Sequence, residues 1–196
     1  MKNPLESLHK TLGLGLCLAV IAFLILHVSQ VGELQFWQFL FRWIHVFFGV
    51  LWIGLLYYFN FVQVPSMPKI PDEQKPAISK VIAPTALFFF RWAAAATVLF
   101  GVITALFNKE LLDGLIFLDG THGTIGIGMW LALIMAFNVW VLIWPNQQKV
   151  LGLVPADPDA KKKAARTALL ASRTNVMLSL PMLYCMVGQQ NLVSPF

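Results

Sequence analysis

Long apolar stretches alternate with short polar segments along the chain, and this pattern predicts helices that cross a membrane. A helix rises about 1.5 Å per residue, so roughly 20 apolar residues span a hydrocarbon core about 30 Å thick. Stretches of about that length make up most of the sequence. We therefore expect an all-α integral membrane protein, in which residues 1–196 form one bundle of about five transmembrane helices. The predicted helices are residues 12–29, 36–61, 84–107, 123–144 and 175–192.

Prolines and polar residues mark the predicted connections between these helices. Proline lacks a backbone N–H and its ring obstructs the preceding helical turn, so a cluster of prolines predicts a loop. Such a cluster separates the second and third helices, while single prolines are expected to open the third helix and to end the fourth. We also expect a short, solvated helix at residues 157–166, separate from the fifth span. These prolines are Pro65, Pro68, Pro71, Pro76, Pro84 and Pro145.

Composition agrees with a membrane protein. Only 12% of the residues are charged and 58% are hydrophobic, whereas about a quarter of the residues in soluble domains are charged. The net charge of +5 does not indicate nucleic acid, because the basic residues occupy short segments between apolar stretches. Eleven Lys and Arg residues lie in the N-terminal tail and in the second and fourth loops, whereas Lys109 is the basic residue of the other two loops. This bias predicts a cytoplasmic N-terminus and a periplasmic C-terminus in a bacterial inner membrane.

The first apolar stretch is expected to be an uncleaved helix rather than a secretory signal, because no small-residue cleavage site follows it. Cys17 and Cys185 both lie inside apolar stretches, and no Cys-x-x-Cys-His sequence is present. A disulfide framework and a covalently attached c-type haem are therefore excluded.

Two arginines, Arg42 and Arg91, lie within apolar stretches that contain no acidic residue. A cation at membrane depth costs about 2.5 kcal/mol or more, so it usually faces a partner, a cavity or a bound anion. An anionic ligand, such as a haem propionate or a lipid phosphate, would meet this need. Hydrogen bonds to helix-end carbonyls, with the side chains reaching toward the membrane surface, are the alternative.

His45 follows Arg42 by three residues, which puts both on one face of the second helix. An imidazole inside the membrane and a cation one turn nearer the surface suit a b-type haem whose propionates point outward. The second axial ligand would be His27 or His122, each near an outer helix end. In the alternative interpretation all three histidines are hydrogen-bonded packing or helix-end residues. Separately, polar side chains are expected to bridge the helices, namely Asn138, Asn175, Thr97 and Thr104.

The segment Arg42–Gly54, with its Arg-Trp-Ile-His start and its Gly-Val-Leu-Trp-Ile-Gly end, resembles a signature of the bacterial urate oxidase N-terminal (membrane) domain family. Two later stretches, residues 134–147 and 171–183, resemble the same family in the same order. The resemblance implies a haem-linked membrane oxidoreductase, in this case a short form without the family's C-terminal cytochrome c domain. The family pattern has histidines where this chain has Thr174 and, approximately, Gly126, whereas His45 is retained as one haem ligand.

We therefore expect a membrane protein that binds haem b and takes part in electron transfer. Its expected partners are the lipid bilayer and either a cytochrome c or a larger membrane complex. Whether it is an enzyme stays open. The alternative is a non-catalytic accessory subunit that supports a larger respiratory or photosynthetic complex. A transporter is disfavoured, because no Asp or Glu lies inside a predicted transmembrane helix to relay protons.

Overall fold

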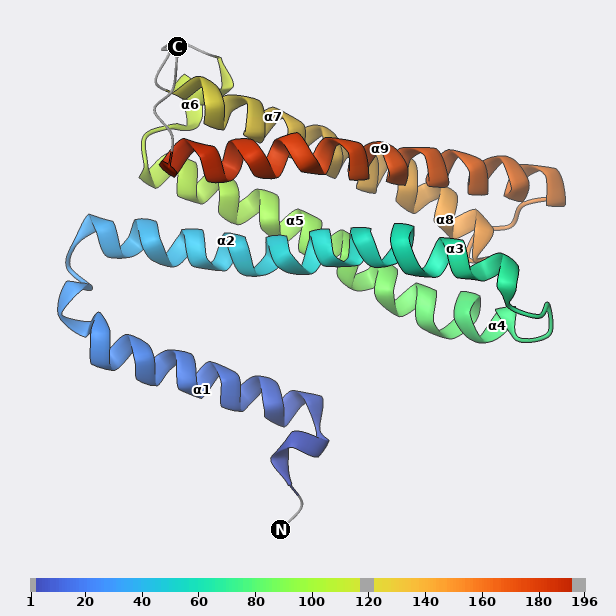
Figure 1. Ribbon diagram of the computed structural model, residues 1–196, viewed down its shortest axis with the longest axis horizontal. Coiled ribbons are helices and arrows are strands. Elements are labelled where there is room, and N and C mark those ends of the chain that lie inside the picture. The colour runs from blue at the N-terminus through green and yellow to red at the C-terminus, as the bar shows by residue number, and fades with distance from the viewer. Residues whose placement is uncertain (1–2, 117–121, 192–196) are drawn as a thin grey trace. The chain divides into compact units, whose positions relative to one another are not determined.

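A computed structural model describes residues 3–116 and 122–191, and every regular element in these ranges is helical (Figure 1). The chain divides into two compact units, Met1–Leu40 and Phe41–Phe196. Four helices in the described ranges are long and apolar enough to cross a membrane, which agrees with the first four predicted spans and makes this a multi-pass membrane protein by length and composition. These helices are Leu8–Leu26, Leu34–Lys69, Lys75–Phe107 and Gly123–Val150.

The first unit contains η1 (Pro4–Glu6), α1 (Leu8–Leu26), η2 (Val28–Gln30) and the beginning of α2 (Leu34–Tyr57). Aromatic rings close the turn between the two helices. The ring centroids of Phe23 and Phe36 lie 5.4 Å apart, and Trp37 Nε1 donates a hydrogen bond to the Val31 carbonyl at 3.1 Å. A short connection thus joins the first two spans.

The predicted proline-rich loop is much shorter than expected. The second span continues through Pro65 and Pro68, the third begins before Pro76, and the helical segments leave only residues 70–74 between them. The fourth span likewise continues beyond Pro145. In chain order the segments are η3 (Tyr58–Gln63), α3 (Val64–Ser66), η4 (Met67–Lys69), α4 (Lys75–Ala77), η5 (Ile78–Ile82), α5 (Ala83–Phe107), α6 (Leu111–Leu115), α7 (Gly123–Phe137), η7 (Asn138–Ile143) and α8 (Trp144–Val150).

Three π-helical segments explain why Pro65, Pro84 and Pro145 do not end their helices. The segments η3, η5 and η7 are π-helices, and the second residue after each one is Pro65, Pro84 or Pro145. The residue before the proline bonds to a carbonyl five residues back, as Trp144 N–H does to Val139. Since a proline ring clashes with the carbonyl four residues earlier in an α-helix, the wider π turn relieves that clash. A local change of helix type therefore lets the apolar spans continue.

The last helix, α9 (Pro158–Asn191), is a single element of 34 residues. The short helix predicted at residues 157–166 and the described part of the fifth predicted span are therefore the two ends of one helix. Asp157 Oδ1 accepts from the N–H of Ala160 at 2.7 Å and caps its start. The helix passes through Pro181 without ending, and α9 is not among the four helices that meet the apolar criterion for a span.

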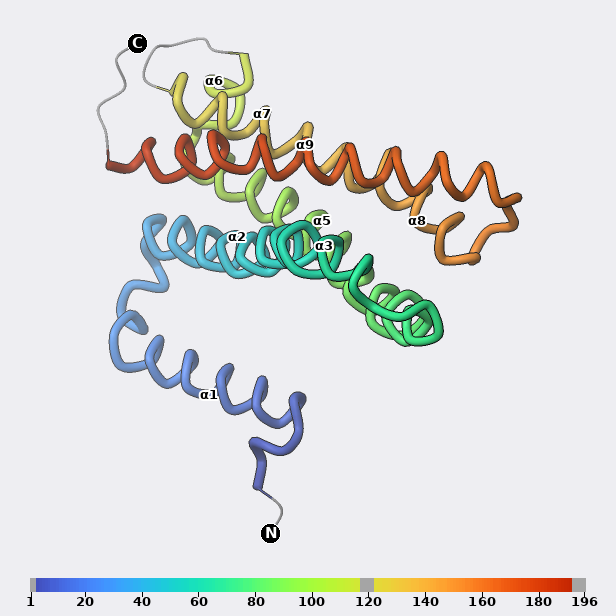
Figure 2. Tube along the Cα trace, turned by 45° about the vertical axis from the view of Figure 1, so that its right-hand side comes forward, coloured from blue at the N-terminus to red at the C-terminus, as the bar shows by residue number. Residues whose placement is uncertain are grey.

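The core of the second unit lies where α2, α5, α7, η7 and α9 meet. Large side chains that are almost completely buried fill it, among them Trp52, Leu56, Phe90 and Met135. Helices α7 and α9 lie side by side in both views (Figures 1 and 2). A Cβ added at Gly128 of α7 would lie 3.1 Å from Cys185 Cβ of α9, so these two helices approach closely.

Candidate functional site

His45 lies on α2 and reaches the backbone of α5. Its Nδ1 is 2.8 Å from the carbonyl oxygen of Thr97. A carbonyl oxygen only accepts hydrogen bonds, so Nδ1 carries the proton and donates it. In the neutral ring, Nε2 is then unprotonated and has a lone pair available for a metal or a hydrogen-bond donor.

Gly101 makes room for this imidazole on α5. A Cβ at position 101 would lie 2.9 Å from Nδ1 and 3.0 Å from Cε1 of His45, but 4.0 Å from Nε2. Any larger residue would therefore displace the edge of the ring that carries Nδ1. The sequence analysis did not identify Gly101, although a glycine in the interior of an apolar helix is itself a signal of close approach.

Thr97 and Thr104 do not bridge helices through their hydroxyl groups, contrary to the prediction. Thr97 Oγ1 donates to the Ala93 carbonyl and Thr104 Oγ1 donates to the Phe100 carbonyl, both at 2.7 Å within α5. A threonine hydroxyl in a helix reaches the carbonyl of the preceding turn, and this local bond needs no second helix. Thr97 instead contributes its backbone carbonyl to the contact with His45.

Arg42 lies one turn before His45 on α2 and is half-buried. The two side chains are close enough to interact electrostatically. Within residues 3–116 and 122–191, no hydrogen bond or ion pair joins the Arg42 guanidinium to another residue. The structure thus brings the predicted cation and the predicted imidazole together.

Arg91 has aromatic partners. Its guanidinium carbon lies 3.6 Å from the centroid of the Trp144 ring and 5.6 Å from that of Phe88. A guanidinium over the face of a tryptophan is attracted by the ring quadrupole. This contact accounts for a cation on an apolar helix without a bound anion, so the propionate role predicted for Arg91 has a simpler alternative.

The two candidates for a second axial ligand lie at helix ends. His27 ends α1 in the first unit, and its Nδ1 lies 3.3 Å from Gln30 Oε1. His122 is the N-cap residue of α7 in the second unit. No cluster of three or more His, Cys, Asp or Glu side chains occurs in the part of the chain that the structure describes. The second ligand therefore stays a prediction.

Asn138 and Asn175 bridge η7 and α9, as predicted. Asn138 Nδ2 donates to Asn175 Oδ1 at 2.8 Å, and Asn175 Nδ2 donates to the Met135 carbonyl at 2.9 Å. Asn175 is completely buried. Because a buried amide is costly unless it is hydrogen-bonded, this chain of bonds fixes the position of α9 against η7.

Two further polar contacts attach α9 to the second span, and the sequence analysis missed both. Tyr57 and Ser179 are joined by a hydrogen bond of 2.9 Å between their hydroxyl oxygens, and Asn60 Nδ2 donates to Ser172 Oγ at 2.8 Å. The spacing of Ser172, Asn175 and Ser179 places them on one helix face, which was the available signal. These three polar residues of α9 therefore face partners inside the bundle.

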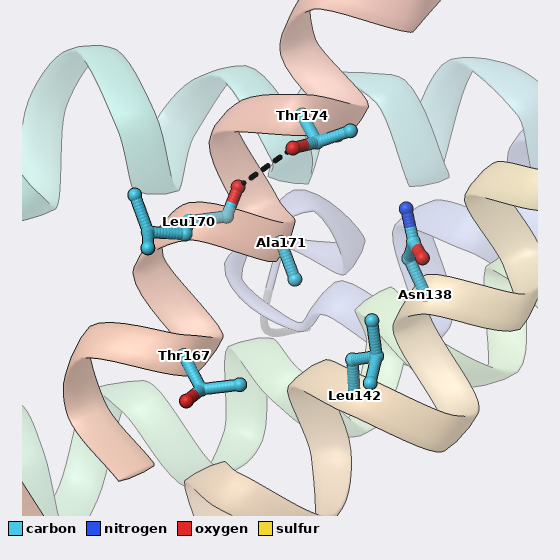
Figure 3. Close-up of a pocket in the computed structure, with 6 residues that line it drawn as sticks. All are labelled: Asn138, Leu142, Thr167, Leu170, Ala171 and Thr174. Atoms are coloured by element: carbon cyan, nitrogen blue, oxygen red, sulfur yellow. Dashed lines mark hydrogen bonds between the residues drawn. The ribbon is translucent and has the colours of Figure 1, made fainter. Parts of the chain in front are cut away.

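A pocket of about 320 Å³ lies between α9 and η7 (Figure 3). Its threonines bond within their own helix, Thr174 Oγ1 to the Leu170 carbonyl at 3.0 Å and Thr167 Oγ1 to the Lys163 carbonyl at 3.1 Å. The pocket does not include His45. It is lined by Asn138, Leu142, Thr167, Leu170, Ala171 and Thr174.

This side of the bundle does not suit a haem. Thr174 occupies a position where the family pattern has a histidine, and a threonine hydroxyl does not replace an imidazole as a haem ligand. The other position where the resemblance implies a histidine lies near Gly126, which is buried on α7. The pocket between α9 and η7 has no imidazole in its lining to bind a haem iron, whereas Nε2 of His45 has a free lone pair.

These features define an all-helical, multi-pass membrane protein with a polar contact surface along its last helix. The model of the family described as urate oxidase N-terminal matches residues 116–192, which confirms the resemblance over the part of the chain that contains α7, α8 and α9. The match covers fewer than half of the 196 residues and begins after the segment Arg42–Gly54. No curated protein and no solved structure matches the chain.

Proposed function

We propose that this protein binds a b-type haem through Nε2 of His45 and takes part in electron transfer. The observation that carries the proposal is the hydrogen bond from His45 Nδ1 to the Thr97 carbonyl. Histidines that bind metals usually donate their other N–H to a carbonyl or carboxylate, which orients the ring and makes the ligating nitrogen more basic. His45 has this arrangement.

The neighbouring residues have complementary roles in this proposal. Gly101 leaves space for the imidazole against α5, and Arg42, one turn away, would neutralise a propionate. A bound haem would supply one-electron chemistry at its iron, with a potential set by the axial ligands and by burial. His27 or His122 would supply the second axial nitrogen. A cytochrome c or a larger membrane complex would be the electron-transfer partner.

We propose five membrane spans, with a cytoplasmic N-terminus and a periplasmic C-terminus in a bacterial inner membrane. The concentration of basic residues in the second and fourth loops supports this orientation. The inward hydrogen bonds of Asn175 and Ser179 support the C-terminal part of α9 as the fifth span. A helix whose polar groups are paired within the bundle need not expose them to lipid.

A non-catalytic accessory subunit of a larger membrane complex is the second candidate. The observation that favours it is the close packing of α7 against α9, where Gly128 and Cys185 meet and Thr174 stands in place of a histidine. A chain that lacks these histidines could retain the helical scaffold while losing a redox centre.

The test is the haem content of the full chain purified from haem-replete cells. We expect a Soret band and a b-type pyridine haemochrome spectrum, both lost in His45→Ala and retained in His9→Ala, which changes an exposed histidine of the N-terminal segment. Purified wild-type protein without haem would refute the proposal. Co-purification of a stoichiometric larger complex, with no haem on this chain, would select the accessory role.

A further inference from the structure

We propose that one end of the second unit is a binding surface for the phosphate headgroups of anionic phospholipids. Two connections between helices lie at this end, the one from η4 to α4 and the one from α8 to α9 (Figures 1 and 2). Exposed basic side chains surround them. We call this set the basic surface: Lys69, Lys80, Lys149, Lys161, Lys162, Lys163 and Arg166.

The cations of the basic surface lack acidic partners. Asp72, Glu73, Asp157 and Asp159 are present in the same connections, yet the ion pair found in the described ranges is Lys75 with Asp72, outside the basic surface. The hydrogen bond from Lys75 lowers the pKa of the Asp72 carboxyl. Charge within the chain therefore does not explain the exposed cations of the basic surface.

The position of the three consecutive lysines argues against a role in helix stability. Lys161 lies in the first turn of α9, where the partial positive charge of the helix end disfavours a cation, and Lys162 and Lys163 follow it directly. Asp157 and Asp159 already complement that end, the first as its cap. Three adjacent lysines at this end of the helix fit an anion outside the chain.

A lipid headgroup is the anion best placed to meet this surface. The apolar helices Leu34–Lys69 and Gly123–Val150 both end on the side of the second unit where the basic surface lies, so this surface faces one side of the membrane. Basic clusters next to membrane helices attract anionic lipids in this way. The positive-inside rule depends on how many basic residues a loop carries, and it does not explain why three lysines are adjacent on a regular helix.

The opposite end of the second unit provides a matched control. Lys109 lies there between α5 and α6, next to Glu110 and close to Asp113. A cation in this acidic setting is not expected to attract anionic lipid.

The experiment compares the thermal unfolding of the full chain in nanodiscs of phosphatidylcholine and in nanodiscs containing phosphatidylglycerol. We expect a higher Tm with phosphatidylglycerol, a difference that shrinks as salt is added because exposed charges are screened within about 10 Å at 0.1 M. The triple variant K161Q/K162Q/K163Q should lose most of the difference, and K109Q should retain it. Circular dichroism before heating shows whether each variant is folded.

Equal Tm values for wild-type protein in the two lipids would overturn the proposal, as would a triple variant that keeps the full difference. Inorganic phosphate added to the phosphatidylcholine sample distinguishes the two sources of phosphate. If it reproduces the stabilisation, the surface binds free phosphate and the lipid assignment is wrong. The wild-type comparison needs no variant, so the test holds even where the triple variant does not fold.

Discussion

The imidazole of His45 is hydrogen-bonded to the carbonyl of Thr97, 52 residues further along the chain. This bond joins α2 to α5 and determines which ring nitrogen is free. Gly101, one turn beyond Thr97, is the residue that permits it. The candidate haem ligand is thus oriented by two residues of a different helix.

Gly101→Ala should displace the His45 ring. The added Cβ would lie 2.9 Å from Nδ1, and overpacking of this kind costs about 1–3 kcal/mol. We expect lower stability to unfolding in SDS and, if His45 binds haem, a reduced Soret band. Gly54→Ala is the matched control, because a Cβ there meets nothing within 4 Å. Equal stability of the two variants would contradict the packing described for His45.

The pair Asn138 and Asn175 should show a measurable coupling energy. A double-mutant cycle with alanine at each position should give about 0.6–2 kcal/mol, the range for hydrogen bonds between membrane helices. Each single variant leaves the other amide buried without this partner. Asn191→Ala is a suitable control, because Asn191 is exposed and bonds only within α9 to the Val187 carbonyl. A coupling near zero would mean that the amides do not bridge η7 and α9.

Replacement of Pro145 by alanine should change stability by less than about 1 kcal/mol, since the wider π turn of η7 already removes the steric clash of the proline ring. Ala132→Pro, within regular α7, should cost about 3 kcal/mol or more, because no wider turn precedes it. Unfolding in SDS and helical circular dichroism compare the two variants. A large loss in Pro145→Ala would show that the proline itself maintains the local structure.

Arg91→Ala should lower stability by about 0.5–2 kcal/mol through loss of the contact with the Trp144 ring. Arg91→Lys should retain part of this energy, since an ammonium group also binds an aromatic face. Haem content, measured on the same preparations, should not change in either variant. A selective loss of haem in Arg91→Ala would instead support the propionate role that the sequence predicts.

The sequence by itself determined the class of this protein. Apolar stretches long enough to cross a bilayer are a local property, and four of them are the four apolar helices of the structure. The three-residue spacing of Arg42 and His45 likewise placed both on one helix face. The pattern also identified Asn138 and Asn175 as bridging residues, because amides inside apolar helices need partners from another helix.

Tertiary structure alone decided which partners these side chains find. The carbonyl beside His45, the aromatic ring beneath Arg91 and the hydroxyl group bonded to Tyr57 all come from distant segments. Helical periodicity indicates which face a residue occupies and carries no information on what packs against it. The prolines were misjudged for a related reason: an α-helix excludes a mid-helix proline, whereas a π turn, which the sequence pattern did not reveal, accommodates it.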